Sequence, residues 1–290
     1  MADPIRFSVP SAGGVTLASY RWAPVGEPKG IVQIAHGMGE HALCYQDVAD
    51  VLVAAGYVVY SHDHRGHGAT LREGDTPGVI GSEGWYELVS DIGRVGARAR
   101  EEHGGLRLAL LAHSMGSFAA QQYVLDSSDA VDALALTGTA AIDLRPAPKG
   151  EAPVDLTALN APFQPARTDY DWLTRDDDQV DRYVADPLCG FGIDAAGAKA
   201  MFEGALRLAD PGRVKGIRSD LPVYAAVGDA DPVNAQLTLV HPLIERLRNA
   251  GLTDVTLRVY EGARHKVLIE TNRAQVLAEL VAWLDQEVTC

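Results

Sequence analysis

The sequence is poor in cysteine. Its 290 residues include three cysteines, Cys44, Cys189 and Cys290, and no two of them form a Cys-x-x-Cys pair. Positions so scattered argue against a disulfide framework and against a zinc or redox site built on cysteine. We therefore expect neither, and we interpret Cys189 as a buried filler residue rather than a second nucleophile.

Positive charge is also scarce. The sequence has 25 Lys and Arg against 39 Asp and Glu, which gives a formal net charge of −14. Proteins that bind nucleic acid or anionic membranes need clustered Lys and Arg, so this balance disfavours both classes of partner. The net charge does not argue against neutral or cationic partners.

Long apolar runs are missing too. No stretch approaches the roughly 18 apolar residues that a membrane-spanning helix requires. Residues 1–6, Met-Ala-Asp-Pro-Ile-Arg, contain no cationic stretch followed by an apolar one, the pattern of a signal peptide. We therefore expect no transmembrane segment, no signal peptide and a cytoplasmic location.

The rest of the composition is ordinary for a globular protein, with 47% hydrophobic and 22% charged residues. Hydrophobic patterning predicts strands that alternate with amphipathic helices. The expected strands are 15–20, 31–35, 57–60, 106–111, 133–136, 221–227 and 255–260, and the expected helices are 47–54, 86–100, 116–125, 237–249 and 274–286. This alternation predicts an α/β fold with a mostly parallel sheet and helices on both faces.

The alternation breaks between about residues 141 and 220. This stretch is rich in Pro, Asp and aromatic residues and shows no clear strand. A structureless loop of about 80 residues inside a compact domain is improbable, so we predict a helical insertion. The expected organisation is a core of residues 1–140 and 221–290 with an inserted cap subdomain at 141–220.

The most informative local pattern surrounds Ser114. A buried strand ends, Ser114 follows, and a helix begins near Gly116. This is the context of a nucleophile elbow, in which small residues two before and two after the serine permit a strained turn. Ala112 departs from the usual Gly-x-Ser-x-Gly pattern by one methyl group. A serine that caps an ordinary strand-to-helix turn is the alternative.

Two later strand ends carry the other groups that a serine nucleophile needs. Asp231 follows the strand at 221–227, and His265 follows the strand at 255–260. The chain order Ser…Asp…His is that of α/β-hydrolases. Asp229 is a rival acid, but we prefer Asp231, which lies further past the strand end. The alternative for His265 is a surface loop histidine.

An oxyanion hole requires two backbone N–H donors aimed at the developing negative charge. Met115, which follows the predicted nucleophile, is expected to supply one of them. Met38 is expected to supply the other, because Gly37 and Gly39 let the backbone turn after an early strand. A plain tight turn before a helix is the alternative.

These residues together resemble one family, the monoacylglycerol lipase/lysophospholipase branch of the α/β-hydrolases. The matching motifs are HGMGEH (36–41), SHDHRGHG (61–68), HSMG (113–116), Asp231 and HKVL (265–268). The resemblance implies an α/β-hydrolase fold with Ser114 as nucleophile, His265 as base and Asp231 as its orienting acid. It also implies Met38 and Met115 as oxyanion donors and no cofactor. It fades across 141–220, the place of the family's cap.

The motif at 61–68 contains three histidines, a residue type that often binds metal ions. His62, His64 and His67 do not follow the His-x-His-x-Asp-His pattern of dinuclear hydrolases, because Gly66 stands before His67. We therefore expect no metal, and interpret the cluster as a hydrogen-bonded turn beside the site.

Aromatic residues of the expected cap are candidates for a substrate pocket. We single out Phe163, Trp172, Phe191 and Phe202; the alternative is that they form the core of the cap. The predicted substrate is a small-molecule ester, and the preferred candidate is a monoacylglycerol or another single-chain ester.

The same triad suits a lactonase, thioesterase, amidase or acyltransferase, and the fold also suits a non-catalytic binding protein. Ser114 excludes dehalogenases and epoxide hydrolases, which need a carboxylate nucleophile. Acyl length, leaving group and oligomeric state stay open.

Overall fold

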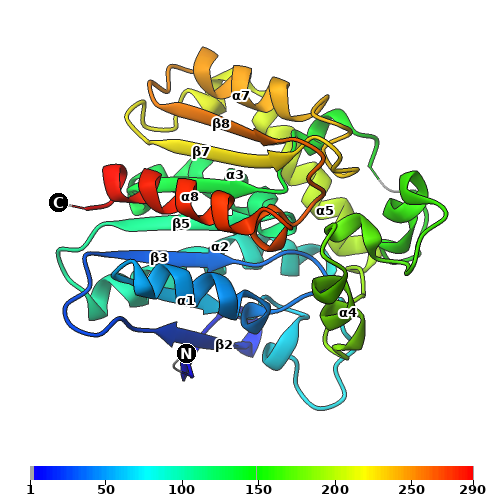
Figure 1. The fold of residues 1–290 in the computed structure, drawn as a ribbon, viewed down its shortest axis with the longest axis horizontal. Coiled ribbons are helices and arrows are strands. Elements are labelled where there is room, and N and C mark those ends of the chain that lie inside the picture. Colours follow the sequence, from blue (N-terminus) through cyan, green and yellow to red (C-terminus); the bar gives the residue numbers. More distant parts are fainter. Residues whose placement is uncertain (1–2, 148, 290) are drawn as a thin grey trace.

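The computed structural model describes residues 3–147 and 149–289, and its centre is an eight-stranded sheet (Figure 1). The strand order is β1-β2-β4-β3-β5-β6-β7-β8. From β4 onward in this order all neighbours pair in parallel, so the carboxyl ends of these strands share one edge of the sheet. The strands are β1 (Ile5–Pro10), β2 (Thr16–Trp22), β3 (Gly30–Ala35), β4 (Tyr57–His62), β5 (Leu108–His113), β6 (Ala133–Thr137), β7 (Val223–Gly228) and β8 (Val255–Tyr260).

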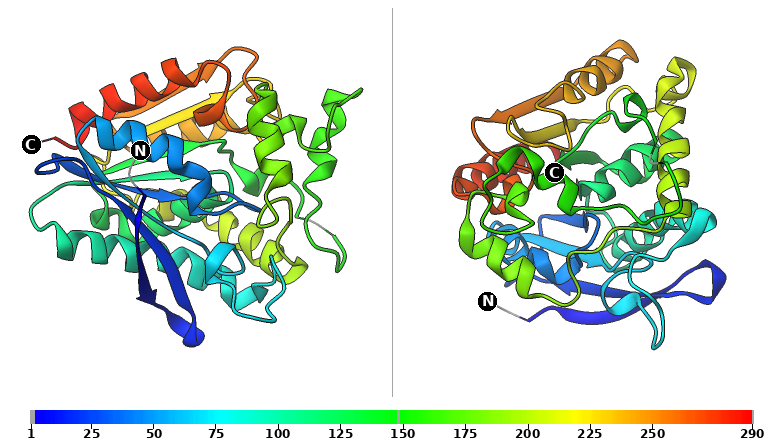
Figure 2. Two further views of the ribbon diagram at one scale, coloured as in Figure 1. Left: turned by 60° about the horizontal axis from the view of Figure 1, so that its bottom comes forward. Right: turned by 90° about the vertical axis from the view of Figure 1, so that its right-hand side faces the viewer.

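The first two strands form an antiparallel hairpin, and β2 also runs antiparallel to β4. Figure 2 shows this dark-blue hairpin at the edge of the sheet. β1 is absent from the predicted strands, although Ile5, Phe7 and Val9 alternate with polar residues. That period of two is the signal of a half-buried strand, and it could have identified β1.

Helices cover both faces of the sheet, as the strand–helix alternation predicts (Figure 1). In β5, Leu108 and Leu110 pack in the cluster that contains the apolar residues of α2 and α3. Ala109 and Leu111 point the opposite way, into the cluster formed with α1 and α8. The helices are α1 (Gln46–Ala54), α2 (Gly81–Glu102), α3 (Met115–Ser127), α7 (Val240–Asn249) and α8 (Arg273–Glu287).

One predicted helix begins later than expected. The pattern predicts a helix from residue 237, but α7 starts at Val240. Ala235, Gln236 and Leu237 have φ values of 52°, 48° and 71°, a left-handed conformation that a right-handed helix excludes.

The segment 141–220 contains no strand among its described residues. It lies beyond the carboxyl ends of the parallel strands, and the right-hand view of Figure 2 looks onto this end. Its helical content is as expected, but most of it is short. The elements are α4 (Asp177–Ala185), α5 (Ala195–Ala205), α6 (Pro211–Val214) and the 3-10 turns Ile142–Leu144, Thr157–Phe163, Asp171–Leu173 and Leu206–Ala209.

No helix within the described ranges combines the length and the apolar character needed to cross a bilayer.

Candidate active site

Ser114 lies in a sharp turn between β5 and α3. Its backbone has φ 50° and ψ −121°, a conformation that costs a residue other than glycine on the order of 1–3 kcal/mol. Gly116 makes the turn possible, since a Cβ atom there would lie 2.4 Å from the carbonyl oxygen of Ala35 in β3. The turn therefore has the strained strand-to-helix geometry of a nucleophile elbow.

Asp231 and His265 are brought together by the ends of β7 and β8. Nδ1 of His265 lies 2.9 Å from Oδ2 of Asp231, and both side chains are buried. The other Asp231 oxygen accepts a hydrogen bond from the N–H of Val233 at 2.8 Å. A carboxylate fixed in this way keeps the proton on Nδ1 of the neutral imidazole, so that Nε2 carries the free lone pair.

Asp229, the rival acid, has another partner. Its Oδ1 accepts a hydrogen bond from the N–H of Gly262 at 2.7 Å. Asp229 therefore ties the turn after β7 to the turn after β8, while Asp231 reaches His265.

Ser114 and His265 both line a cavity of about 280 Å³. In the described part of the chain no hydrogen bond joins the Ser114 hydroxyl to His265; such contacts often tighten only when substrate binds. The wall contributed by 141–220 is mainly apolar, through Ile142, Val154, Leu156, Leu159, Met201 and Phe202.

Met38 and Met115 also line the cavity. Met115 is the first residue of α3, where a backbone N–H has no partner within the helix. Within the described residues, neither the Met38 N–H nor the Met115 N–H has an intramolecular acceptor. Backbone donors without an acceptor are the kind of group that an oxyanion hole uses.

A buried ion pair stands behind the Met38 turn. The Lys266 ammonium lies 2.5 Å from Oε2 of Glu40, and the two side chains are 7% and 3% exposed. Oε1 of Glu40 accepts hydrogen bonds from the Gly37 N–H and the Tyr45 hydroxyl. Burial acts to raise the pKa of Glu40, but the Lys266 charge and the hydrogen bonds from Lys266 and Tyr45 outweigh it and lower the pKa to about 2. The ionised pair thus fixes the loop that carries Met38.

The histidines of the 61–68 motif are fully buried, and two of them, His64 and His67, hydrogen bond neighbouring loops, whereas neither ring nitrogen of His62 has a partner among the described residues. Burial lowers the pKa of His62, His64 and His67, to about 4 for His67. His67 is hydrogen bonded through both ring nitrogens, to the Arg65 carbonyl at 2.9 Å and the Gly39 N–H at 3.2 Å. These contacts support the structural interpretation of the cluster.

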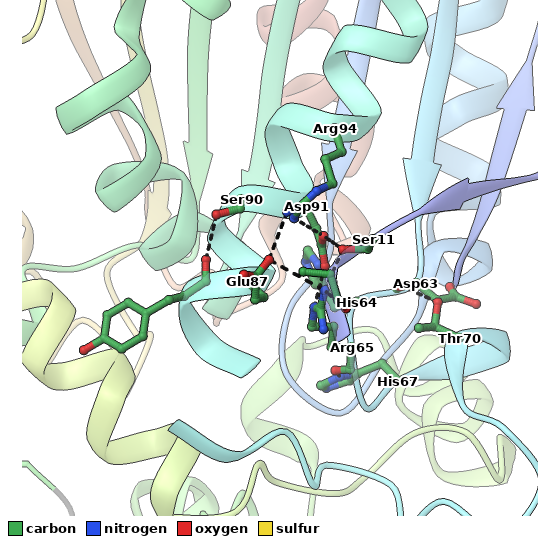
Figure 3. A network of polar contacts seen from close by, with 12 residues as sticks. Ser11, Asp63, His64, Arg65, His67, Thr70, Glu87, Ser90, Asp91 and Arg94 are labelled. Carbon is green, nitrogen blue, oxygen red and sulfur yellow. Dashed lines mark hydrogen bonds and ion pairs between the residues drawn. The ribbon is translucent and has the colours of Figure 1, made fainter. Parts of the chain in front are cut away.

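Arg65, in the same loop, joins it to α2 (Figure 3). Its Nε lies 2.7 Å from Oδ2 of the fully buried Asp91. Figure 3 shows Arg65 directed toward Asp91, Ser11 and Glu87, and Ser11 also hydrogen bonds Asp91. The motif therefore acts as a rigid support behind the Met38 turn.

The four predicted pocket aromatics divide into two pairs. Trp172 and Phe202 line the cavity, and the Trp172 ring lies 5.0 Å from the His265 ring. Phe163 instead packs against the Arg264 guanidinium at 4.4 Å, and the Phe191 ring lies 5.0 Å from the His67 ring. Phe163 and Phe191 thus contact these polar partners and are not among the described residues that line the cavity.

The pairing of Glu40 with Lys266 was not anticipated. Each residue is visible in a motif, next to the glycine-rich turn or to His265. Their separation of 226 residues left no local signal that they meet.

Known proteins share both the sequence and the fold of this chain. Residues 26–272 match the family described as "Serine aminopeptidase, S33". The chain is 32% identical over 287 residues to a monoacylglycerol lipase of Mycolicibacterium smegmatis, which covers 96% of this chain and 95% of the relative. It is 29% identical over 289 residues to the Homo sapiens monoglyceride lipase, with coverages of 95% and 89%. A carboxyl esterase from Bacillus coagulans, solved in complex with glycerol, matches with a TM-score of 0.88 at 23% identity over 99% of each chain. These matches confirm the predicted α/β-hydrolase fold.

Proposed function

Because the chain belongs to the serine aminopeptidase S33 family of α/β-hydrolases, we propose that it cleaves carboxylic esters through an acyl-enzyme on Ser114. The observation that carries the proposal is the Asp231–His265 pair, whose imidazole lines the same cavity as a serine in a strained turn. Monoacylglycerols and other single-chain esters are the proposed substrates, supported by the names of the two lipase relatives.

The proposed reaction has two halves. Nε2 of His265 takes the proton of the Ser114 hydroxyl as Oγ bonds to the ester carbonyl carbon, and the N–H groups of Met38 and Met115 hold the resulting oxyanion. Collapse breaks the ester bond, and His265 gives its proton to the departing alcohol. His265 then deprotonates a water molecule, which attacks the carbonyl carbon of the acyl-Ser114 ester. As the second tetrahedral intermediate breaks its bond to Oγ, His265 returns the proton to Oγ, so that the acid leaves and Ser114 is regenerated. Asp231 stabilises the imidazolium in both halves.

The walls of the cavity favour an apolar acyl group. The segment 141–220 supplies side chains such as Leu159, Met201 and Phe202, and we propose that it acts as a cap over Ser114. Each methylene group buried from an acyl chain contributes about 0.8 kcal/mol.

The family description also names aminopeptidases, and an amide substrate is the main alternative. An aminopeptidase must pair the terminal ammonium of a peptide with a negative charge. Glu40, a buried carboxylate of the cavity wall, is already paired with Lys266. This pairing leaves Asp155, an exposed residue of the cavity lining, as the carboxylate that could meet a terminal ammonium, so a peptide-like substrate has to be included in the test.

Matched substrates test the proposal. The purified chain would be assayed with monoacylglycerols of several acyl lengths, with the N-acyl amides of the same acids, and with an aminoacyl anilide. We expect the monoacylglycerols to be hydrolysed fastest, with an optimum acyl length. Faster cleavage of the anilide would make the protein a peptidase, and turnover of none of them would favour a binding protein.

A further inference from the structure

A second cavity, of about 290 Å³, contains four side chains that ester hydrolysis does not use. They are His41 and Cys44, from the turn that leads into α1, and Asp186 and Cys189, from the segment after α4. One nitrogen, oxygen or sulfur atom from each of them lies within 4.8 Å of those of the other three. Two segments 145 residues apart thus bring a nitrogen, two sulfurs and a carboxylate oxygen to one point.

Both segments present their side chains in the same way. Each pair has two residues between its members, as His41-x-x-Cys44 and Asp186-x-x-Cys189. The Cys44 N–H donates to the His41 carbonyl at 3.0 Å, and the Cys189 N–H donates to the Asp186 carbonyl at 3.1 Å. Each pair therefore spans one tight turn, with the ligand spacing that structural zinc sites commonly use. The sequence has no Cys-x-x-Cys pair to indicate such a site, because the residue three positions before Cys44 is His41 and the one three positions before Cys189 is Asp186.

The distances fit a tetrahedral metal better than a disulfide. The two sulfur atoms lie 3.7 Å apart. Two zinc–sulfur bonds of about 2.3 Å at the tetrahedral angle place their sulfurs about 3.8 Å apart. A disulfide needs a separation of about 2.05 Å, so the sulfurs would have to close by well over an ångström. Nε2 of His41 lies 2.9 Å from Oδ2 of Asp186, and zinc requires this distance to open only to about 3.3 Å.

The surroundings also suit a divalent cation. Two thiolates and one carboxylate more than balance a charge of +2. Lys266 lines this cavity too, but its ammonium is already paired with Glu40. Imidazole nitrogen, thiolate sulfur and carboxylate oxygen are the three protein ligand types that bind zinc, a borderline-soft ion.

We propose that His41, Cys44, Asp186 and Cys189 bind one structural zinc ion. With four protein ligands the site has no open position for a substrate, so its role is to join the core to the segment 141–220. The two parts already meet here, because the Gly39 carbonyl accepts hydrogen bonds from the Gly190 N–H at 3.0 Å and the Tyr183 hydroxyl at 2.8 Å. The ion would hold this contact one residue from Met38.

Metal titration of the full chain tests the proposal without any enzyme assay. The reduced protein, freed of metal with a chelator, would be titrated with Zn²⁺ in competition with a chromophoric chelator, and with Co²⁺ as a spectroscopic probe. We expect one equivalent of zinc to bind and the melting temperature to rise. Cobalt should show thiolate-to-metal charge transfer and the intense visible bands of a tetrahedral site.

Variants assign the ligands. Cys44→Ser and Cys189→Ser, one on each segment, should each weaken zinc binding at least about 100-fold, beyond the 10–100-fold typical of losing a group that only supports a ligand. Asp186→Asn should weaken it at least about tenfold. Cys290→Ser is the matched control for the cysteines. Asp47→Asn, in the same cavity but outside the cluster, is the control for Asp186. Both controls should bind zinc as the parent does.

Two results would overturn the proposal. The reduced chain could bind no zinc, or it could bind zinc equally well without Cys44 and without Cys189. In the first case, treatment with glutathione disulfide could convert two free thiols into a Cys44–Cys189 disulfide. That last result would identify the cluster as a redox pair instead.

Discussion

The two sides of the Ser114 cavity are built in different ways. On the sheet side, Ser114, Asp231 and His265 each follow the end of a parallel strand. The strands before Ser114 and Asp231 are buried along their whole length. On the other side, the segment 141–220 is made of short helices and turns. Its longest helix, α5, is anchored to α3 by the Gln122 amide, which donates to the Met201 carbonyl at 3.1 Å.

This difference suggests that the reaction and the choice of substrate depend on different parts of the molecule. Backbone pairing fixes the strand ends, so the groups that we propose to act on the ester carbonyl are held by the whole sheet. The apolar wall is held by side-chain packing, which tolerates substitution better. We therefore expect changes at the strand ends to remove the reaction and changes in 141–220 to alter which substrate reacts.

The largest expected effect is that of Ser114→Ala. It removes the proposed nucleophile, and loss of a triad member typically lowers kcat by a factor on the order of 10⁴ to 10⁶. Ser90→Ala changes an exposed residue of α2, labelled in Figure 3, and is the matched control that should keep parental activity. Steady-state kinetics on a monoacylglycerol would measure both. A Ser114→Ala protein within tenfold of the parent would remove Ser114 from the mechanism.

Asp231 and Asp229, two carboxylates that follow β7, differ in their expected effect on kcat. Asp231→Asn should lower kcat about 10⁴-fold, because an amide at this position can favour the wrong tautomer of His265. Asp229→Asn should stay within about tenfold of the parent, because Asp229 contacts only the Gly262 backbone in this region. The pH–rate profile of each variant would be recorded with kcat. The opposite ranking would reassign the acid to Asp229.

Glu40→Gln should affect stability more than most substitutions. It leaves the Lys266 ammonium buried without its partner, and breaking a buried pair costs about 3–5 kcal/mol of the free energy of unfolding. Adding Lys266→Met should restore most of that loss. Glu203→Gln removes the exposed ion pair with Lys199 and serves as the control, with a much smaller effect. Urea denaturation would compare the four proteins. Equal effects of Glu40→Gln and Glu203→Gln would contradict the assigned role of the buried pair.

The same pair predicts a dependence of stability on pH. The pKa of Glu40 is about 2 in the folded protein against a usual value of 4.5. Its contribution is therefore complete above about pH 4.5 and is lost as the pH falls toward 2. The difference in unfolding free energy between the parent and Glu40→Gln should be smaller at pH 3 than at pH 6. A difference that is constant or grows toward low pH would contradict this assignment.

The smallest effect is expected in the segment 141–220. Phe202→Ala enlarges the apolar wall and should move the preferred acyl chain to a greater length. Each additional buried methylene contributes about 0.8 kcal/mol, or roughly fourfold in kcat/KM. Phe163→Ala is the matched control outside the cavity and should keep the parental profile. If only the control variant shifts the profile, the acyl chain lies elsewhere.

Local patterns in the sequence predicted the strand ends well. The apolar runs of β5 and β7 end where these buried strands end, which placed Ser114 and Asp231 at one edge of the sheet. The β-branched residues of the more exposed β8 placed His265 at the same edge. The strand β1 was missed at an edge where half of the residues face solvent.

Contacts between distant segments could not be predicted in this way. Phe191 and Phe202 are the same residue type in the same segment, yet one packs on His67 and the other lines the cavity. No periodic pattern in 141–220 marks which side faces Ser114. The meeting of Glu40 with Lys266, and that of Cys44 with Cys189, depend on how loops 226 and 145 residues apart are folded together.

Covalent labelling tests the central claim most directly. The chain would be treated with a fluorophosphonate, which phosphorylates an activated serine, and the site would be identified by peptide mass spectrometry. We predict one label, on Ser114, slowed by a competing monoacylglycerol and by Asp231→Asn but unchanged by Asp229→Asn. A label on another residue, or equal labelling of the Ser114→Ala protein, would contradict the account.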